Sequence, residues 1–224
     1  MLASTDHNLQ LFHDQEPVHT HQKCSRCYKI QRGHAFKLSL CNGCQIDMYC
    51  SKECQVADWP NHKTACKQYK KERIQLAEMT GIASAAPDIY AWMKYYDTPL
   101  KNCAVAALNP RVEPHSERTD CLYLQIRHTG DTTVPISQRF IVESVGRESV
   151  SKFQRTSMAA PAGYYDQACN MGRIEMGSDF YGVARYALTV VFGPENAPNG
   201  AKHMWKHFSI NKSTARAART RLDW

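Results

Sequence analysis

The chain has 224 residues, 43% of them hydrophobic and 22% charged, and a formal net charge of +7. These values are typical of folded globular proteins and exclude a wholly disordered chain. Residues 1–23 form a polar segment without the apolar run of a secretory leader, and no later stretch approaches the roughly 18 apolar residues of a membrane span. We therefore expect an intracellular protein, in nucleus or cytoplasm, that does not contact membranes.

The next segment, residues 24–66, holds seven of the ten cysteines. Clustered thiols in a reducing compartment indicate a metal site rather than disulfides. The thiols and one histidine form four pairs, and zinc takes four tetrahedral ligands, so eight donors fill two closed structural sites. The pairs are Cys24-x2-Cys27, Cys41-x2-Cys44, Cys50-x3-Cys54 and His62-x3-Cys66.

Both x3 pairs suit helices, because residues four apart share a helical face. Ser51 is predicted to cap a short helix that holds Cys54, and Asp58 a second helix whose first turn tolerates Pro60. A segment of about 43 residues is near the size below which metals must supplement a hydrophobic core. We expect the segment to be unfolded without zinc.

The run from Tyr49 to Cys66, YCSKECQVADWPNHKTAC, resembles the MYND-type zinc finger. The resemblance implies a small cross-brace fold in which the ligand pairs interleave. One departure is the thirteen-residue gap before Cys41, which predicts a reshaped early hairpin. His21 and His34 are alternative ligands, although a solvated loop histidine is the simpler interpretation. The implied sets are Cys24, Cys27, Cys50 and Cys54 for zinc 1, and Cys41, Cys44, His62 and Cys66 for zinc 2.

MYND-type fingers generally bind proteins, in several cases short proline-rich peptides in an extended conformation. The family's peptide-contact positions correspond here to Gln55 and Trp59, four residues apart. An extended proline-containing segment loses little entropy on docking, so this role is physically reasonable. The alternative is that Trp59 only shields the second zinc site from water, and the sequence leaves both interpretations open.

Residues 67–87 are predicted to form a polar helix that ends near Gly81, followed by a linker containing Pro87. From residue 88, apolar side chains recur at helical spacing in two runs, which predicts two amphipathic helices. Alternating or apolar runs predict strands at residues 122–127, 140–145 and 186–192. Residues 88–224 are thus predicted to be an α+β region with a small mixed or antiparallel sheet and a basic tail. Residues 146–183 fit neither pattern.

The resulting prediction is a zinc-binding adaptor for a protein or peptide partner, with transcriptional regulation as one setting. The alternative is a transcription-associated factor that contacts nucleic acid through Lys212, Arg216 and Arg219. Seven thiolates and two zinc ions lower the net charge to about +4, which argues against a dedicated phosphate-binding surface.

Two enzyme classes are alternatives to an adaptor. Some MYND-type fingers belong to SET-domain lysine methyltransferases, but those proteins are much larger, and this sequence lacks their motifs outside the finger. A thiol enzyme would need a lone cysteine near a histidine, and lone cysteines in apolar runs are usually core residues. We therefore expect no enzymatic activity. The cysteines in question are Cys103, Cys121 and Cys169, and the histidines are His115, His128, His203 and His207.

Overall fold

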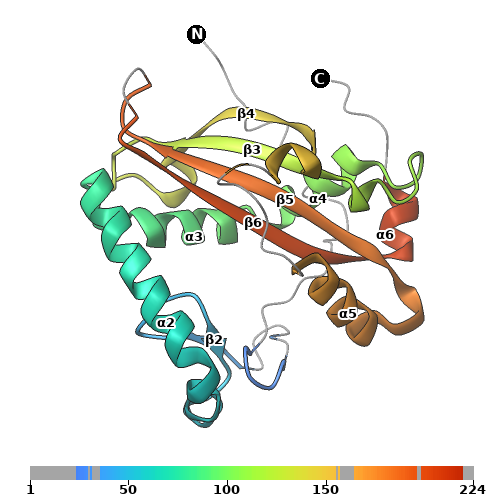
Figure 1. Cartoon of the computed structure of the whole chain (residues 1–224), viewed down its shortest axis with the longest axis horizontal. Helices are drawn as coiled ribbons and strands as arrows, with labels where there is room; N and C mark the ends of the chain where they lie inside the picture. Colours follow the sequence, from blue (N-terminus) through green and yellow to red (C-terminus); the bar gives the residue numbers. More distant parts are fainter. Residues whose placement is uncertain are drawn as a thin grey trace.

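The computed structural model describes residues 24–29, 31, 36–154, 156, 164–195 and 198–218. A small two-stranded finger at one end is joined to a larger sheet by one long helix (Figure 1). No helix in the described ranges combines the length and apolar character needed to cross a membrane. The elements are β1 (Ser39–Leu40), β2 (Met48–Tyr49), α2 (Lys52–Thr80), α3 (Ala85–Tyr95), α4 (Asp97–Leu108), η1 (Ser116–Arg118), β3 (Asp120–His128), η2 (Ile136–Gln138), β4 (Phe140–Ser149), η3 (Val150–Phe153), α5 (Tyr164–Met176), η4 (Gly177–Asp179), β5 (Phe180–Phe192), β6 (Gly200–Asn211) and α6 (Lys212–Ala217).

Helix α2 is continuous where the sequence predicted two helices. Ser51 caps it as expected, its hydroxyl accepting from the Cys54 N–H at 3.3 Å, and Gly81 ends it with a φ of 72°. Asp58 starts no second helix; its carboxylate accepts a 2.8 Å hydrogen bond from the Tyr49 hydroxyl. Pro60 lies inside α2, where it removes one backbone donor. The finger's contacts with α2 on both sides of Pro60 compensate for that loss.

Helix α2 belongs to both parts of the molecule. Its first half buries His62 and Cys66 in the finger, and Leu76 further along is 6% exposed within the large core. The helix therefore runs through the predicted boundary after residue 66. The predicted linker is also shorter than expected, because α3 begins at Ala85 and contains Pro87. Ala85 is fully buried, so residues 85–87 are part of the core.

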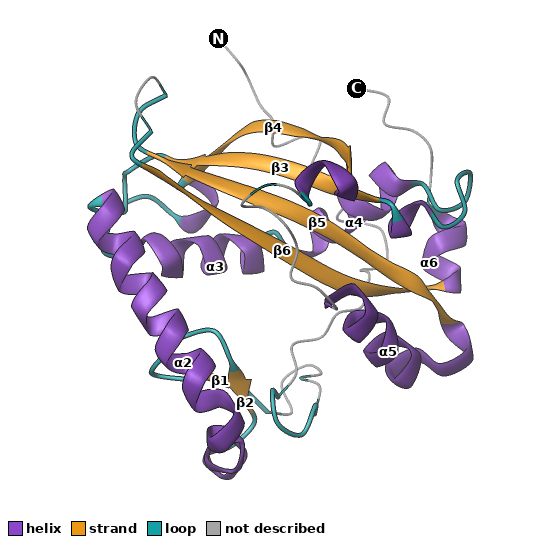
Figure 2. Cartoon of the chain, in the orientation of Figure 1, coloured by secondary structure: helices purple, strands orange, loops and turns teal. Residues whose placement is uncertain are grey.

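The sheet has four strands in the order β4-β3-β5-β6 (Figure 2). Strand β3 pairs antiparallel with β4 and parallel with β5, and β5 pairs antiparallel with β6, so the sheet is mixed. Helix α4 packs against β3 and β5, over a core that includes Leu124 and Leu188. The predicted α+β class, its two helices and its three strands are confirmed; β6 and α5 were not predicted.

Residues 146–183, which fit neither the helical nor the strand pattern in the sequence, contain the end of β4, η3, α5, η4 and the start of β5. Gly172 interrupts the helical pattern because α5 approaches the sheet closely there. A Cβ at this position would lie 2.4 Å from the Phe180 ring and 2.5 Å from the Ser209 hydroxyl. Gly177 has a φ of 54°, a conformation that favours glycine.

Candidate metal centre

The eight predicted donors lie in two groups of four, and within each group all donor atoms are within 4.8 Å of one another. In the first group, the Cys50 sulfur is 3.5 Å from those of Cys27 and Cys54. In the second, the Cys41 and Cys66 sulfurs are 3.8 Å apart. Zinc–sulfur bonds of about 2.3 Å in a tetrahedron place sulfurs about 3.8 Å apart, so the donor sets fit two zinc ions. The groups are Cys24, Cys27, Cys50 and Cys54, and Cys41, Cys44, His62 and Cys66.

Two tight backbone turns present the Cys-x2-Cys pairs. The Tyr28 N–H donates to the Cys24 carbonyl at 3.0 Å, and the Gln45 N–H donates to the Cys41 carbonyl at 2.8 Å. Tyr28 and Gln45 each follow the second cysteine of a pair and have φ values of 59° and 60°. Non-glycine residues adopt this left-handed region at an energetic cost, which is offset where the surroundings fix the turn. The two turns therefore share the same hydrogen bond and the same left-handed residue after the second cysteine.

The two groups differ in burial. All four members of the second group are buried, because they lie between the β1–β2 turn and α2. In the first group only Cys24 is buried, and Cys27 is exposed. Gly43 permits the close packing of the second group, since a Cβ there would lie 2.7 Å from the Cys66 sulfur.

Asp47 is a residue of this centre that the sequence analysis missed. One carboxylate oxygen lies 3.2 Å from His62 Nδ1, so His62 presents Nε2 to the sulfurs, 3.4 Å from Cys41. The other oxygen accepts a 2.9 Å hydrogen bond from the hydroxyl of Ser25, which follows a cysteine of the first group. A carboxylate behind a metal-binding histidine fixes its tautomer and orientation. Asp47 therefore connects the two groups, and no spacing rule points to it.

One thiol in each group is biased toward the thiolate. Burial raises the pKa of Cys24, but hydrogen bonds from the backbone around Cys27 and Cys50 outweigh it and bring the pKa to about 6. Burial opposes ionisation of Cys41 as well, and backbone donors near Cys44 together with the His62 ring lower its pKa to about 6. Because zinc binds the thiolate, each group has a ligand already prepared near neutral pH.

The predicted peptide contacts lie on the first turns of α2. Trp59 is 41% exposed, and its ring also approaches that of His62 edge-on, with centroids 6.1 Å apart. Trp59 thus covers part of the second group and presents a face to solvent, so the two interpretations are compatible. Gln55 is half-buried, and its side-chain amide makes no hydrogen bond to other described residues. Beside them Val56 is 63% exposed.

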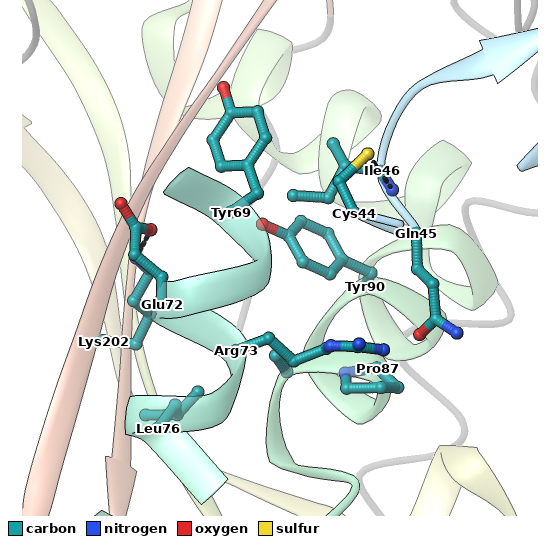
Figure 3. Close-up of a pocket in the computed structure, with 11 residues that line it drawn as sticks. Cys44, Gln45, Ile46, Tyr69, Glu72, Arg73, Leu76, Pro87, Tyr90 and Lys202 are labelled. Atoms are coloured by element: carbon teal, nitrogen blue, oxygen red, sulfur yellow. Dashed lines mark hydrogen bonds and ion pairs between the residues drawn. The ribbon is translucent and has the colours of Figure 1, made fainter. Parts of the chain in front are cut away.

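A pocket at the junction of the finger with α2 and α3 has a volume of about 30 Å³. Tyr69 and Tyr90 point into it beside Cys44 (Figure 3). The Glu72–Lys202 ion pair, at 2.9 Å, joins α2 to β6 at its edge. Small-molecule sites usually exceed about 300 Å³, so this pocket is a small gap between packed elements rather than a ligand site.

The remaining candidates are dispersed. Lys212 and Arg216 are exposed on α6, and Arg219, like His21 and His34, lies outside the described residues. No hydrogen bond within the described ranges joins Cys103, Cys121 or Cys169 to a histidine. Burial raises the pKa of all three thiols, that of Cys121 to about 12.

Residues 24–66 match the family model of the MYND finger, a protein-interaction module. The "SET domain and MYND-type zinc finger protein 6" of Schizosaccharomyces pombe is 41% identical over 59 residues, 26% of this chain and 10% of that protein. "Dauer abnormal formation protein 25" of Caenorhabditis elegans is 36% identical over 76 residues, 34% of this chain and 18% of that protein. The human "Histone-lysine N-methyltransferase SMYD3" is 40% identical over 47 residues, 21% of this chain and 10% of that protein. No solved structure matches the chain.

These relatives correct one prediction. We expected no enzymatic activity, but two of the three proteins are named for a SET domain or for a methyltransferase activity. That expectation is therefore wrong, because this kind of finger also occurs in proteins named for a SET domain or a methyltransferase activity. The matches cover at most 18% of the relatives' own lengths and assign no catalytic residue to this chain.

Proposed function

We propose that the MYND finger at residues 24–66 binds two structural zinc ions through its eight clustered donors and docks an extended, proline-rich peptide, so that the chain acts as an adaptor. The observation that carries this proposal is the position of Trp59. Its ring rests against His62 of the second metal group, which fixes its orientation, yet 41% of the residue remains exposed. An exposed aromatic held rigid by its support loses little entropy on binding a partner.

The neighbouring side chains extend this docking surface. Gln55 and Trp59 are four residues apart on α2, and Val56 and Trp59 are three apart, so the three side chains share a helical face. The apolar Val56 and Trp59 suit proline side chains, and the Gln55 amide can hydrogen-bond a peptide carbonyl or N–H. Exposed aromatic residues of this kind often dominate binding energy.

Calorimetric titration of the zinc-loaded full chain with a panel of proline-rich peptides tests the proposal. We expect binding that Trp59→Ala removes while both zinc ions remain bound, as verified by metal analysis. Tyr95→Ala is the matched control, because Tyr95 is an aromatic residue 60% exposed on α3, outside the finger. Absence of binding across the panel, or equal binding by wild type and Trp59→Ala, would contradict peptide docking at this site.

A further inference from the structure

One face of α2 carries a continuous exposed stripe that runs from the finger toward the sheet. Its members are spaced three or four residues apart, so they fall within about 80° of the helix circumference. The three apolar members, Val56, Trp59 and Ile74, are 63%, 41% and 46% exposed, and the lysines between them are also exposed. The α2 stripe consists of Val56, Trp59, Lys63, Lys67, Lys70 and Ile74.

The stripe borders the packed side of α2. The buried residues of α2, among them His62, Cys66 and Leu76, centre about 100° around the helix from the stripe, which touches this packed side at Trp59, whose ring contacts His62. No ion pair joins its three lysines to a carboxylate of the described residues, whereas Lys202 is paired with Glu72 of the same helix. The lysines therefore present an uncompensated positive surface directly beside Trp59.

We propose that the docked peptide carries acidic side chains next to its apolar anchor, and that these lie along Lys63, Lys67 and Lys70. The inference rests on the proposed function, since Trp59 supplies the anchor, and it adds the charge of the partner. Opposite charges at this surface would select among proline-rich segments that fit Trp59 equally well.

The dimensions of the stripe set the spacing of the acidic residues. At 1.5 Å per residue, Lys63 lies about 6 Å and Lys70 about 17 Å along the helix from Trp59. An extended peptide advances about 3.3 Å per residue. Acidic side chains two to five positions from the anchor would therefore lie over the lysines.

A nucleic acid fits the stripe less well than an acidic peptide. The lysines are bounded by apolar side chains at both ends, by Val56 and Trp59 on one side and by Ile74 on the other. Phosphate contacts make no use of exposed aliphatic groups, and three lysines make a small phosphate-binding surface. A peptide that combines apolar and acidic residues uses every member of the stripe.

The test uses the zinc-loaded full chain and two peptides with the same proline-rich anchor, one with an acidic flank and one with an uncharged polar flank. Exposed ion pairs change affinity by roughly 1.4-fold to 5-fold each, so three pairs should strengthen binding about tenfold at low salt. The gain should shrink at high salt, because exposed charges are screened. A duplex DNA serves as a third probe.

Two triple variants separate the stripe from net charge. Lys63→Gln, Lys67→Gln and Lys70→Gln together should abolish the gain from the acidic flank. The control variant removes the same charge from exposed lysines outside the stripe and should keep the stronger binding of the acidic-flank peptide. Its substitutions are Lys94→Gln, Lys206→Gln and Lys212→Gln.

The outcomes distinguish this inference from the proposed function. Equal affinity for the two peptides, with binding still lost in Trp59→Ala, would overturn the acidic-partner inference and leave peptide docking intact. DNA binding that needs the stripe lysines, without a gain from the acidic flank, would also overturn it. Failure of both peptides to bind would overturn both proposals.

Discussion

Replacing Asp47 should weaken zinc binding at both metal groups, most strongly at the group that contains His62. The carboxylate lies 3.2 Å from His62 Nδ1 and accepts a 2.9 Å hydrogen bond from Ser25, so Asp47→Ala removes support from both groups. Residues behind metal ligands typically contribute 10-fold to 100-fold to affinity, or about 1.4–2.8 kcal/mol. We expect a loss of this size for Asp47→Ala, and a smaller one for Asp47→Asn, whose amide oxygen can still accept from His62.

Competition between the full chain and a chromophoric chelator measures this loss as zinc released per chain. Asp58→Asn is a matched control, because Asp58 is an acidic residue of the same finger that hydrogen-bonds the Tyr49 hydroxyl rather than a metal ligand. The Asp47→Ala protein should release zinc at a lower chelator concentration than either wild type or Asp58→Asn. Release curves that coincide for all three proteins would refute the bridging role of Asp47.

Two further changes test the packing and the acid response of the sheet region. Gly172→Ala should lower the free energy of unfolding of the sheet region by about 1 kcal/mol in chemical denaturation. Crowding against Phe180 and Ser209 costs about 1–3 kcal/mol, and the higher helix propensity of alanine regains about 1 kcal/mol. Gly146→Ala, where a Cβ meets nothing within 4 Å, is the control; equal stability of the two variants would contradict this packing. Burial and then nearby cations lower the pKa of His207 to about 4, so the unfolded state, with a pKa of about 6.5, binds more protons between these values. The free energy of unfolding should therefore fall by about 1–2 kcal/mol as pH drops from about 6.5 to 5. His207→Gln should lose this part of the pH dependence. Identical pH profiles for wild type and His207→Gln would argue against the shifted pKa.

The sequence predicted the finger well because its signal is local. Ligand spacing and the Ser51 cap depend on neighbouring residues, and zinc chemistry restricts which donors can share an ion. The pairing of Cys24 with Cys50 across the finger came from the family resemblance, since spacing alone allows other combinations. Asp47 could not be found in this way, because its role depends on the tertiary contact with His62.

Misses elsewhere have tertiary causes. Pro60 carries a strong local signal for a helix start, yet it lies inside α2, where packing on either side outweighs the loss of one backbone donor. Pro87 indicated a linker, but it lies in the first turn of α3, where a backbone N–H has no partner within the helix. Helix α5 escaped detection because Gly172 serves a close contact with the sheet, which local periodicity does not reveal. Strand β6 mixes charged and apolar residues along an edge of the sheet and resembles neither strand pattern.

Because α2 is continuous, it fixes the distance between the finger and the sheet. Trp59 lies about 26 Å along the helix axis from Leu76 in the sheet core, and the helix fixes the rotation between these two positions as well as their distance. Each residue inserted into α2 between these points would turn the docking surface by about 100° around the axis. A partner docked on the finger, as proposed above, would therefore be held at a fixed distance and rotation relative to the sheet.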